Sequence, residues 1–252
     1  MPRVLILGGT GDARELAGLL VGRYSVVSSL AGRVREPSRP AGEVRVGGFG
    51  GVPGLVSYLR SAGIDAVVDA THPFAAEMTS HAVTACAAAG VPLVVLRRPG
   101  WVEGPGDRWL RVPSYADAAA ALPSLGTRVL LTIGRQELAP FAGCAGWFLV
   151  RSVDPPSVPL PAHSEVLLSR GPFTREGELA LLREHRIEVV VTKDSGGSAT
   201  YPKLAAAREL GLPVVMIDRP APPPDVTTVL TPTDAAQWLA SLRWGLPRWS
   251  RP

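Results

Sequence analysis

Short runs of β-branched and other apolar residues alternate along the chain with Ala-, Leu- and Arg-rich segments of helical spacing. This alternation is typical of βαβ units, which build a parallel sheet that helices cover on both faces. In the first half we expect strands at Val4–Gly8, Tyr24–Ser28, Glu43–Val46, Ala66–Asp69 and Leu93–Leu96. The helices between them are expected at Ala13–Val21, Gly54–Ala62 and Ala75–Ala89.

The second half repeats this pattern after Arg98–Ser114, a stretch that Pro and Gly interrupt and in which we expect neither helix nor strand. Strands are then expected at Arg128–Ile133, Phe148–Ser152, Glu188–Thr192, Pro213–Ile217 and Val226–Leu230. Helices are expected at Tyr115–Leu122, Glu176–His185, Ala199–Leu210 and Asp234–Leu242. The sequence therefore predicts an α/β protein with two Rossmann-like lobes, residues 1–112 and 113–252, with mainly parallel sheets and a ligand crevice between the lobes.

Composition narrows the class of protein. The 252 residues carry a net charge of +4, and the arginines that supply most of the positive charge are scattered, which argues against a nucleic-acid partner. No apolar run approaches the length of about 18 residues that a membrane span needs, so we expect no membrane partner. The two cysteines have no metal or disulfide spacing, and the chain begins directly with an apolar strand. These features predict a cytoplasmic protein.

A glycine-rich turn follows the first predicted strand and opens the first helix, with the sequence Gly8-Gly9-Thr10-Gly11-Asp12. Such a turn lets backbone N–H groups approach an anion, and the helix amino terminus adds partial positive charge. The third glycine of the full dinucleotide fingerprint is replaced by Arg14. The turn therefore predicts a nucleotide phosphate site, and a merely tight βα turn is the alternative.

The end of the second predicted strand carries no acidic residue of the kind that binds the ribose 2′-hydroxyl of NAD. It carries hydroxyls and a guanidinium instead, in Ser28, Ser29, Leu30, Ala31, Gly32 and Arg33. Because a guanidinium can donate two hydrogen bonds to a 2′-phosphate, this segment favours NADPH over NADH.

Polar side chains also follow the fourth predicted strand, in Asp69-Ala70-Thr71-His72-Pro73-Phe74-Ala75. Pro73 can begin the next helix and holds His72 extended, at the edge of the sheet where ligands bind. His72 is predicted to bind a carboxylate or donate a proton, with a structural turn histidine as the alternative. Glu77 and His81 lie one helical turn apart, but no third ligand is near in the sequence, so we expect no metal.

Three segments of the second half place a cation beside glycine near a predicted strand end. They are Thr132–Arg135, Ser169–Phe173 and Thr192–Ser198. The chain's only two lysines, Lys193 and Lys203, flank the last of these segments. We therefore expect a cationic lining suited to a small polyanion, with solvated surface charge as the alternative.

Taken together, six segments resemble the precorrin-6A reductase family in order and spacing over nearly the whole chain. They are Gly8–Asp12, Asp69–Ala75, Thr132–Arg135, Arg170–Phe173, Lys193–Gly197 with Lys203, and Ile217–Pro220. The resemblance implies NADPH as cofactor, a polycarboxylate tetrapyrrole as substrate, and reduction of precorrin-6A to precorrin-6B in cobalamin biosynthesis. It also implies that hydride reaches one carbon of the double bond and a proton its neighbour.

The resemblance carries roles to individual residues. Cofactor contacts are expected from Gly8, Gly9, Thr10, Gly11, Asp12, from Ser28, Ser29, Leu30, Ala31, Gly32 and Arg33, and from Thr71. Substrate contacts are expected from His72, Pro73, Phe74, Arg135, Arg170, Lys193, Ser195, Gly196, Gly197 and Lys203. The proton donor is left open among His72, Asp194, Tyr201 and bound water.

Two other classes of protein are alternatives to this family, namely another type of dehydrogenase or epimerase and a nucleotide sensor. A short-chain dehydrogenase or epimerase needs a Tyr with a Lys four residues later, and that pair is absent from the sequence. A two-lobed nucleotide sensor without catalytic activity remains open, because a fold does not fix function. The sequence does not separate a metal-free from a cobalt-containing macrocycle, and it leaves the oligomeric state open.

Overall fold

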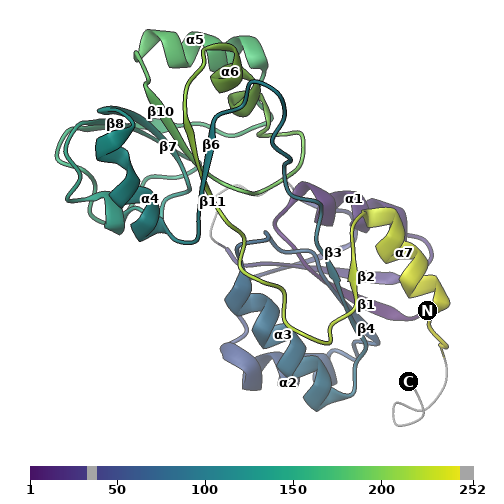
Figure 1. Ribbon diagram of the computed structural model, residues 1–252. Coiled ribbons are helices and arrows are strands. Elements are labelled where there is room, and N and C mark those ends of the chain that lie inside the picture. The colour runs from purple at the N-terminus through teal and green to yellow at the C-terminus, as the bar shows by residue number, and fades with distance from the viewer. Residues whose placement is uncertain (33–38, 245–252) are drawn as a thin grey trace. The chain divides into compact units, whose positions relative to one another are not determined.

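The computed structural model of the protein describes residues 1–32 and 39–244. The chain divides into two compact units (Figure 1). The first contains Met1–Arg98 and the chain from Pro220 onward, and the second contains Pro99–Arg219. Within the described residues, no helix is long and apolar enough to cross a bilayer.

The first unit is built on a six-stranded parallel sheet with the order β12-β5-β4-β1-β2-β3. Its strands are β1 (Arg3–Leu7), β2 (Ser25–Leu30), β3 (Glu43–Val46), β4 (Ala66–Asp69), β5 (Leu93–Leu96) and β12 (Thr228–Val229). The central strands β1 and β4 are almost wholly buried, which is why both are continuous apolar runs.

Two helix pairs cover the two faces of this first sheet (Figure 1). Helices α1 (Gly11–Leu20) and α7 (Pro232–Ser241) pack on one face, and α2 (Gly51–Ser61) and α3 (Ala76–Ala89) pack on the other. In α1 the buried residues recur at helical spacing, at Ala13, Leu16, Ala17 and Leu20. They meet the apolar side chains of β1, β2 and β4, so this face of the helix is fixed by burial.

The second unit repeats this plan on another six-stranded parallel sheet, with the order β6-β11-β10-β7-β8-β9. Its strands are β6 (Trp109–Val112), β7 (Arg128–Thr132), β8 (Trp147–Ser152), β9 (Ser164–Leu168), β10 (Val189–Lys193) and β11 (Val214–Ile217). Helix α4 (Tyr115–Ala121) covers one face, and α5 (Arg175–Glu184) and α6 (Pro202–Glu209) cover the other (Figure 1). Two short 3₁₀ helices, Leu122–Ser124 and Ala139–Phe141, complete the unit. The predicted fold class, two Rossmann-like α/β lobes, is confirmed.

The division of the chain differs from the predicted lobes 1–112 and 113–252 in two places. Strand β6 lies inside the Arg98–Ser114 stretch in which we expected no strand, and it pairs with β11 of the second sheet. Strand β12, expected in the second lobe, pairs with β5 of the first sheet, and α7 packs against α1. Strand β6 is a short edge strand without the long apolar run by which a buried strand is recognised in a sequence. Strand β12 lies within the predicted strand Val226–Leu230, but the sheet that it joins depends on pairing with a strand distant in sequence.

Candidate functional site

The glycine-rich turn joins β1 to α1 in a conformation that internal hydrogen bonds fix. The Gly8 amide donates to the Ser29 carbonyl at 2.9 Å. Thr10 is the N-cap of α1, because its Oγ1 accepts from the Ala13 amide at 3.1 Å and donates to the Ala70 carbonyl at 2.8 Å. Gly9 has a φ of 111°, which favours glycine, and no heavy atom lies within 4 Å of the position of a Cβ there. The turn is therefore rigid and open at Gly9.

Asp12 lies in the first turn of α1 and forms an ion pair that the sequence did not predict. Arg98, which follows β5, donates from Nη1 to the Asp12 carboxylate at 2.6 Å. The pair neutralises a negative charge that would otherwise oppose an anion at this helix amino terminus. Arg98 was missed because it begins the stretch in which we expected neither helix nor strand.

The predicted 2′-phosphate segment is described only in part. Ser28 and Ser29 lie in β2 and are buried, and the Ser28 hydroxyl, in a residue 2 % exposed, has no hydrogen-bond partner. Leu30 is also buried, whereas Ala31 and Gly32 are exposed after the strand. Arg33 lies outside the described residues. Ser28 is thus a buried side chain of the sheet, and its predicted contact with the cofactor stays a prediction.

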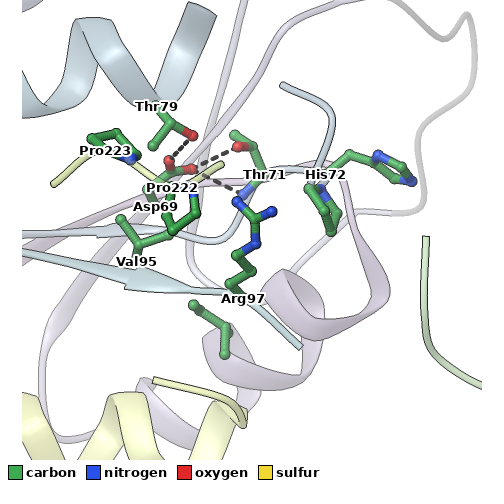
Figure 2. A pocket seen from close by; sticks show the side chains of 10 residues that line it. Asp69, Thr71, His72, Thr79, Val95, Arg97, Pro222 and Pro223 are labelled. Carbon is green, nitrogen blue, oxygen red and sulfur yellow. Dashed lines mark hydrogen bonds between the residues drawn. The ribbon is translucent and has the colours of Figure 1, made fainter. Parts of the chain in front are cut away.

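A pocket lies at the carboxyl ends of β4 and β5 in the first unit (Figure 2). At its base, Asp69 is 1 % exposed and accepts from the Thr71 amide at 3.0 Å, from Thr71 Oγ1 at 2.7 Å and from Thr79 Oγ1 at 2.6 Å. Its lining consists of Asp69, Thr71, His72, Pro73, Thr79, Val95, Leu96, Arg97, Pro222 and Pro223. Thr71, His72 and Pro73, which we predicted as ligand contacts, therefore line a real concavity.

His72 has a defined orientation in this pocket. Its Nδ1 accepts from the Phe74 amide at 3.3 Å, and its ring lies 5.8 Å from that of Phe74 between centroids. In Figure 2 the imidazole points away from the Asp69 carboxylate. With Nδ1 as acceptor, the neutral ring carries its proton on Nε2, which makes Nε2 the donor atom of this side chain.

In the second unit, Asp194 follows β10 and was considered as a proton donor. It is 4 % exposed, and its carboxylate accepts from the Trp101 amide at 3.0 Å and from Arg111 Nη2 at 2.9 Å. Arg219 lies 3.7 Å away. Asp194 thus forms ion pairs with two guanidinium groups inside the second unit, and its role as proton donor stays a prediction.

Tyr201 and Lys203, predicted as a proton donor and a substrate contact, make contacts inside the second unit. The Tyr201 hydroxyl accepts from Arg208 Nη2 at 2.8 Å, and its ring packs on Trp101. Lys203 is 3 % exposed, donates from Nζ to the Thr200 carbonyl at 2.8 Å and lies 4.8 Å from the Trp101 ring centroid. Lys203 therefore belongs to the interior of the second unit, and it does not line a surface for substrate.

Burial is the main reason why the pKa of Lys203 falls to about 7, and the nearby Arg151 lowers it further. Arg151, in β8, is itself buried and donates to both oxygens of Glu178 at 2.5 and 3.2 Å. The Phe173 ring covers the other side of its guanidinium at 4.1 Å. This buried pair could not be predicted from the sequence, because an Arg in a strand and a Glu in a distant helix share no regular spacing.

The remaining predicted cations lie near the carboxyl ends of β7, β9 and β10. Lys193 Nζ is 3.8 Å from the position of a Cβ at Gly134, so the structure brings two of the predicted segments together. Arg135 follows Gly134 and is half-buried, and Arg170 is exposed beyond β9. Ser195 is half-buried, and Gly197 is exposed and accepts from Trp101 Nε1 at 2.9 Å.

Gly196 is required for a steric reason. Its φ is +63°, and a Cβ at this position would lie 2.2 Å from the Pro99 carbonyl oxygen and 2.5 Å from Arg219 Nη2. This glycine therefore allows a close backbone approach within the second unit. Among the described residues, no cluster of His, Cys, Asp and Glu side chains could hold a metal ion.

Parallel sheets flanked by helices, with a rigid glycine-rich turn at a helix amino terminus, define an α/β protein with Rossmann-like units, a class in which such turns often bind nucleotide phosphates. Over residues 3–240 the chain matches the family described as precorrin-6x reductase CbiJ/CobK. The chain belongs to this family.

Curated relatives and a solved structure agree with this assignment. The chain is 56 % identical to the precorrin-6A reductase of Rhodococcus erythropolis, over 96 % of this chain and 99 % of the relative. It is 32 % identical to the cobalt-precorrin-6A reductase of Salmonella typhimurium, over 98 % and 96 % of the two chains. A solved structure of CobK precorrin-6A reductase has a TM-score of 0.90 at 47 % identity, covering 95 % of this chain and 96 % of that one.

Proposed function

We propose that this protein is an NADPH-dependent reductase that converts precorrin-6A to its dihydro product, precorrin-6B, in cobalamin biosynthesis. The observation that carries the proposal is the 56 % identity to a precorrin-6A reductase over nearly the full length of both chains. The identity to the cobalt-precorrin-6A reductase is 32 %. This difference favours the metal-free macrocycle as substrate.

The glycine-rich turn fits the pyrophosphate of a dinucleotide. Its first-turn amides, at Gly11 and Asp12, have no acceptor within the helix, and Gly9 leaves the backbone accessible. Arg98 neutralises Asp12, so the one carboxylate of the turn does not repel a phosphate. When bound, the nicotinamide cofactor supplies a hydride.

The substrate is a polycarboxylate, and the second unit offers cations to bind it. Lys193, Arg135 and Arg170 lie near the carboxyl ends of the parallel strands, which is the edge where ligands of such sheets bind. Charge-assisted hydrogen bonds from these groups would orient the macrocycle and offset its negative charge.

For the proton that completes the reduction, we propose His72. Asp194 and Tyr201 make hydrogen bonds inside the second unit. His72 lines a pocket of the first unit, and Nε2 is the ring atom that would deliver the proton. Bound water is the alternative donor. If water is the donor, His72→Gln should retain wild-type kcat.

The function is tested by incubating the purified protein with precorrin-6A or cobalt-precorrin-6A, each with NADPH or NADH, and following cofactor oxidation. We expect steady turnover with NADPH and precorrin-6A and much slower turnover in the other three mixtures. Cofactor binding without turnover of either macrocycle would instead identify a nucleotide sensor and refute the proposal.

A further inference from the structure

Arg45 is an arginine that the sequence did not single out, and the structure places it beside the predicted cofactor segment. It lies in β3 directly opposite Ser29 of β2 in the register of the parallel pair. Its Nη1 donates to Ser29 Oγ at 3.2 Å. The carbonyl of the same Ser29 accepts from the Gly8 amide of the glycine-rich turn. Ser29 therefore contacts both Arg45 and the glycine-rich turn.

The guanidinium of Arg45 is held in one orientation. Nη1 and Nη2 donate to the carbonyls of Gly47 and Gly48, each at 2.6 Å. Its Cζ lies 3.9 Å from the centroid of the Phe49 ring and 5.2 Å from that of Tyr58. A guanidinium fixed in this way loses little conformational entropy when it binds a ligand.

Among residues 1–32 and 39–244, no carboxylate pairs with Arg45. Within the part of the chain that the structure describes, Arg98, Arg151 and Arg208 each pair with a carboxylate, whereas the acceptors of Arg45 are a hydroxyl and two carbonyls. Its three hydrogen bonds use three of five N–H groups, and they leave Nε–H and one Nη2–H as donors. A half-buried cation with two remaining donors can accept an anion from outside the chain.

The topology indicates which anion this would be. In a dinucleotide-binding sheet, a pyrophosphate at the first glycine-rich turn brings the adenosine ribose to the carboxyl end of the second strand. Ser29 and Arg45 lie together near that end, in β2 and its neighbour β3. We propose that Arg45 determines the cofactor specificity of this protein by binding the 2′-phosphate of the adenosine ribose. The inference rests on the proposed use of NADPH.

The test measures binding of NADP⁺ and NAD⁺ to the full chain by titration calorimetry, without tetrapyrrole. The variant Arg45→Met keeps an apolar stem against Phe49 and removes every N–H group. We expect it to bind NADP⁺ about 10- to 100-fold more weakly, while its affinity for NAD⁺ stays within about twofold of wild type. Arg45→Lys should recover part of the NADP⁺ affinity, because it restores the charge but not the planar fork.

A matched control is Arg60→Met, on the exposed side of α2, which should change neither affinity. If the wild-type protein binds both dinucleotides equally, the proposed use of NADPH is wrong, and so is the inference about Arg45.

If the wild type prefers NADP⁺ and Arg45→Met keeps that preference, only the inference about Arg45 is overturned. Equal losses for both dinucleotides with a lowered melting temperature would show a purely structural role and overturn it as well. If Arg45→Met does not fold, Arg45→Lys decides, because an unchanged NADP⁺ preference in this variant would refute recognition by the guanidinium fork.

Discussion

Replacing Lys203 by Met should change how the stability of the protein depends on pH. Lys203 is buried beside the Arg151–Glu178 pair, and its single hydrogen bond is to the Thr200 carbonyl. Methionine has a similar length and no charge, so Lys203→Met removes the buried ionisable group and largely keeps the packing.

The sign follows from the lowered pKa of Lys203, which is about 7 in the folded protein against 10.5 for an ordinary lysine. Below pH 7 both states bind the proton, and the folded state bears the full cost of the buried charge. Between pH 7 and 10.5 the unfolded chain binds more protons, so the unfolding free energy of the wild type rises with pH. For these two pKa values the rise from pH 7 to pH 9 is about 2 kcal/mol.

The assay is urea denaturation of wild type and variant at pH 6, 7, 8 and 9. The advantage of Lys203→Met over the wild type should be largest at pH 6 and should fall by about 2 kcal/mol between pH 7 and pH 9. Lys193→Met, at the chain's other lysine, is the control and should show no comparable trend. A difference between Lys203→Met and wild type that is constant over this range would refute the reasoning, because it would mean that Lys203 does not titrate there.

Three further substitutions test the proposed contacts and the fold. Lys193→Ala should lower kcat/KM for the macrocycle by about 10- to 150-fold with an unchanged melting temperature, and wild-type kinetics would make Lys193 a surface residue. Arg33→Ala should lower kcat/KM with NADPH by about 10- to 100-fold and leave kcat/KM with NADH unchanged. Equal losses with both cofactors would show that Arg33 does not select between them. Gly196→Ala should lower the unfolding free energy by about 2–4 kcal/mol in urea. Its control Gly211→Ala has a similar φ and no close neighbour, so an equal loss there would exclude the steric argument.

Most strands could be predicted from the sequence, whereas the two edge strands of the second sheet could not. Glu43–Val46, Ala66–Asp69 and Leu93–Leu96 have the predicted bounds, because their patterns are bounded by clear turn residues. Strands β6 and β9 were missed, since most of their residues are at least partly exposed and Pro or Gly lies close by. Their places in the sheet depend on pairing with strands that are distant in sequence, and no local pattern records such pairing.

At the candidate site, backbone features could be predicted better than side-chain roles. The glycine-rich turn and the polar cluster after β4 lie at strand ends as expected, because chain direction alone places them there. The signal of a cation beside glycine did not separate Lys193 from Lys203. One lies half-exposed at the end of a strand, and the other points into the interior from the first turn of α6. The two lysines differ in burial, and burial depends on the folded chain, so the sequence alone could not distinguish their environments.

The role of Asp194 follows from the topology of the second unit. This unit begins at Pro99 and ends at Arg219, and the chain near both ends is bound to the same carboxylate. The Trp101 amide donates to the Asp194 carboxylate. Arg219 Nη2 lies 3.7 Å from the same carboxylate, and Arg219 Nε donates to the backbone carbonyl of Asp194 at 2.6 Å. Arg111, in the edge strand β6, supplies the second guanidinium. Because a carboxylate has several acceptor sites, Asp194 can bind the segment that enters the unit and the segment that leaves it at the same time.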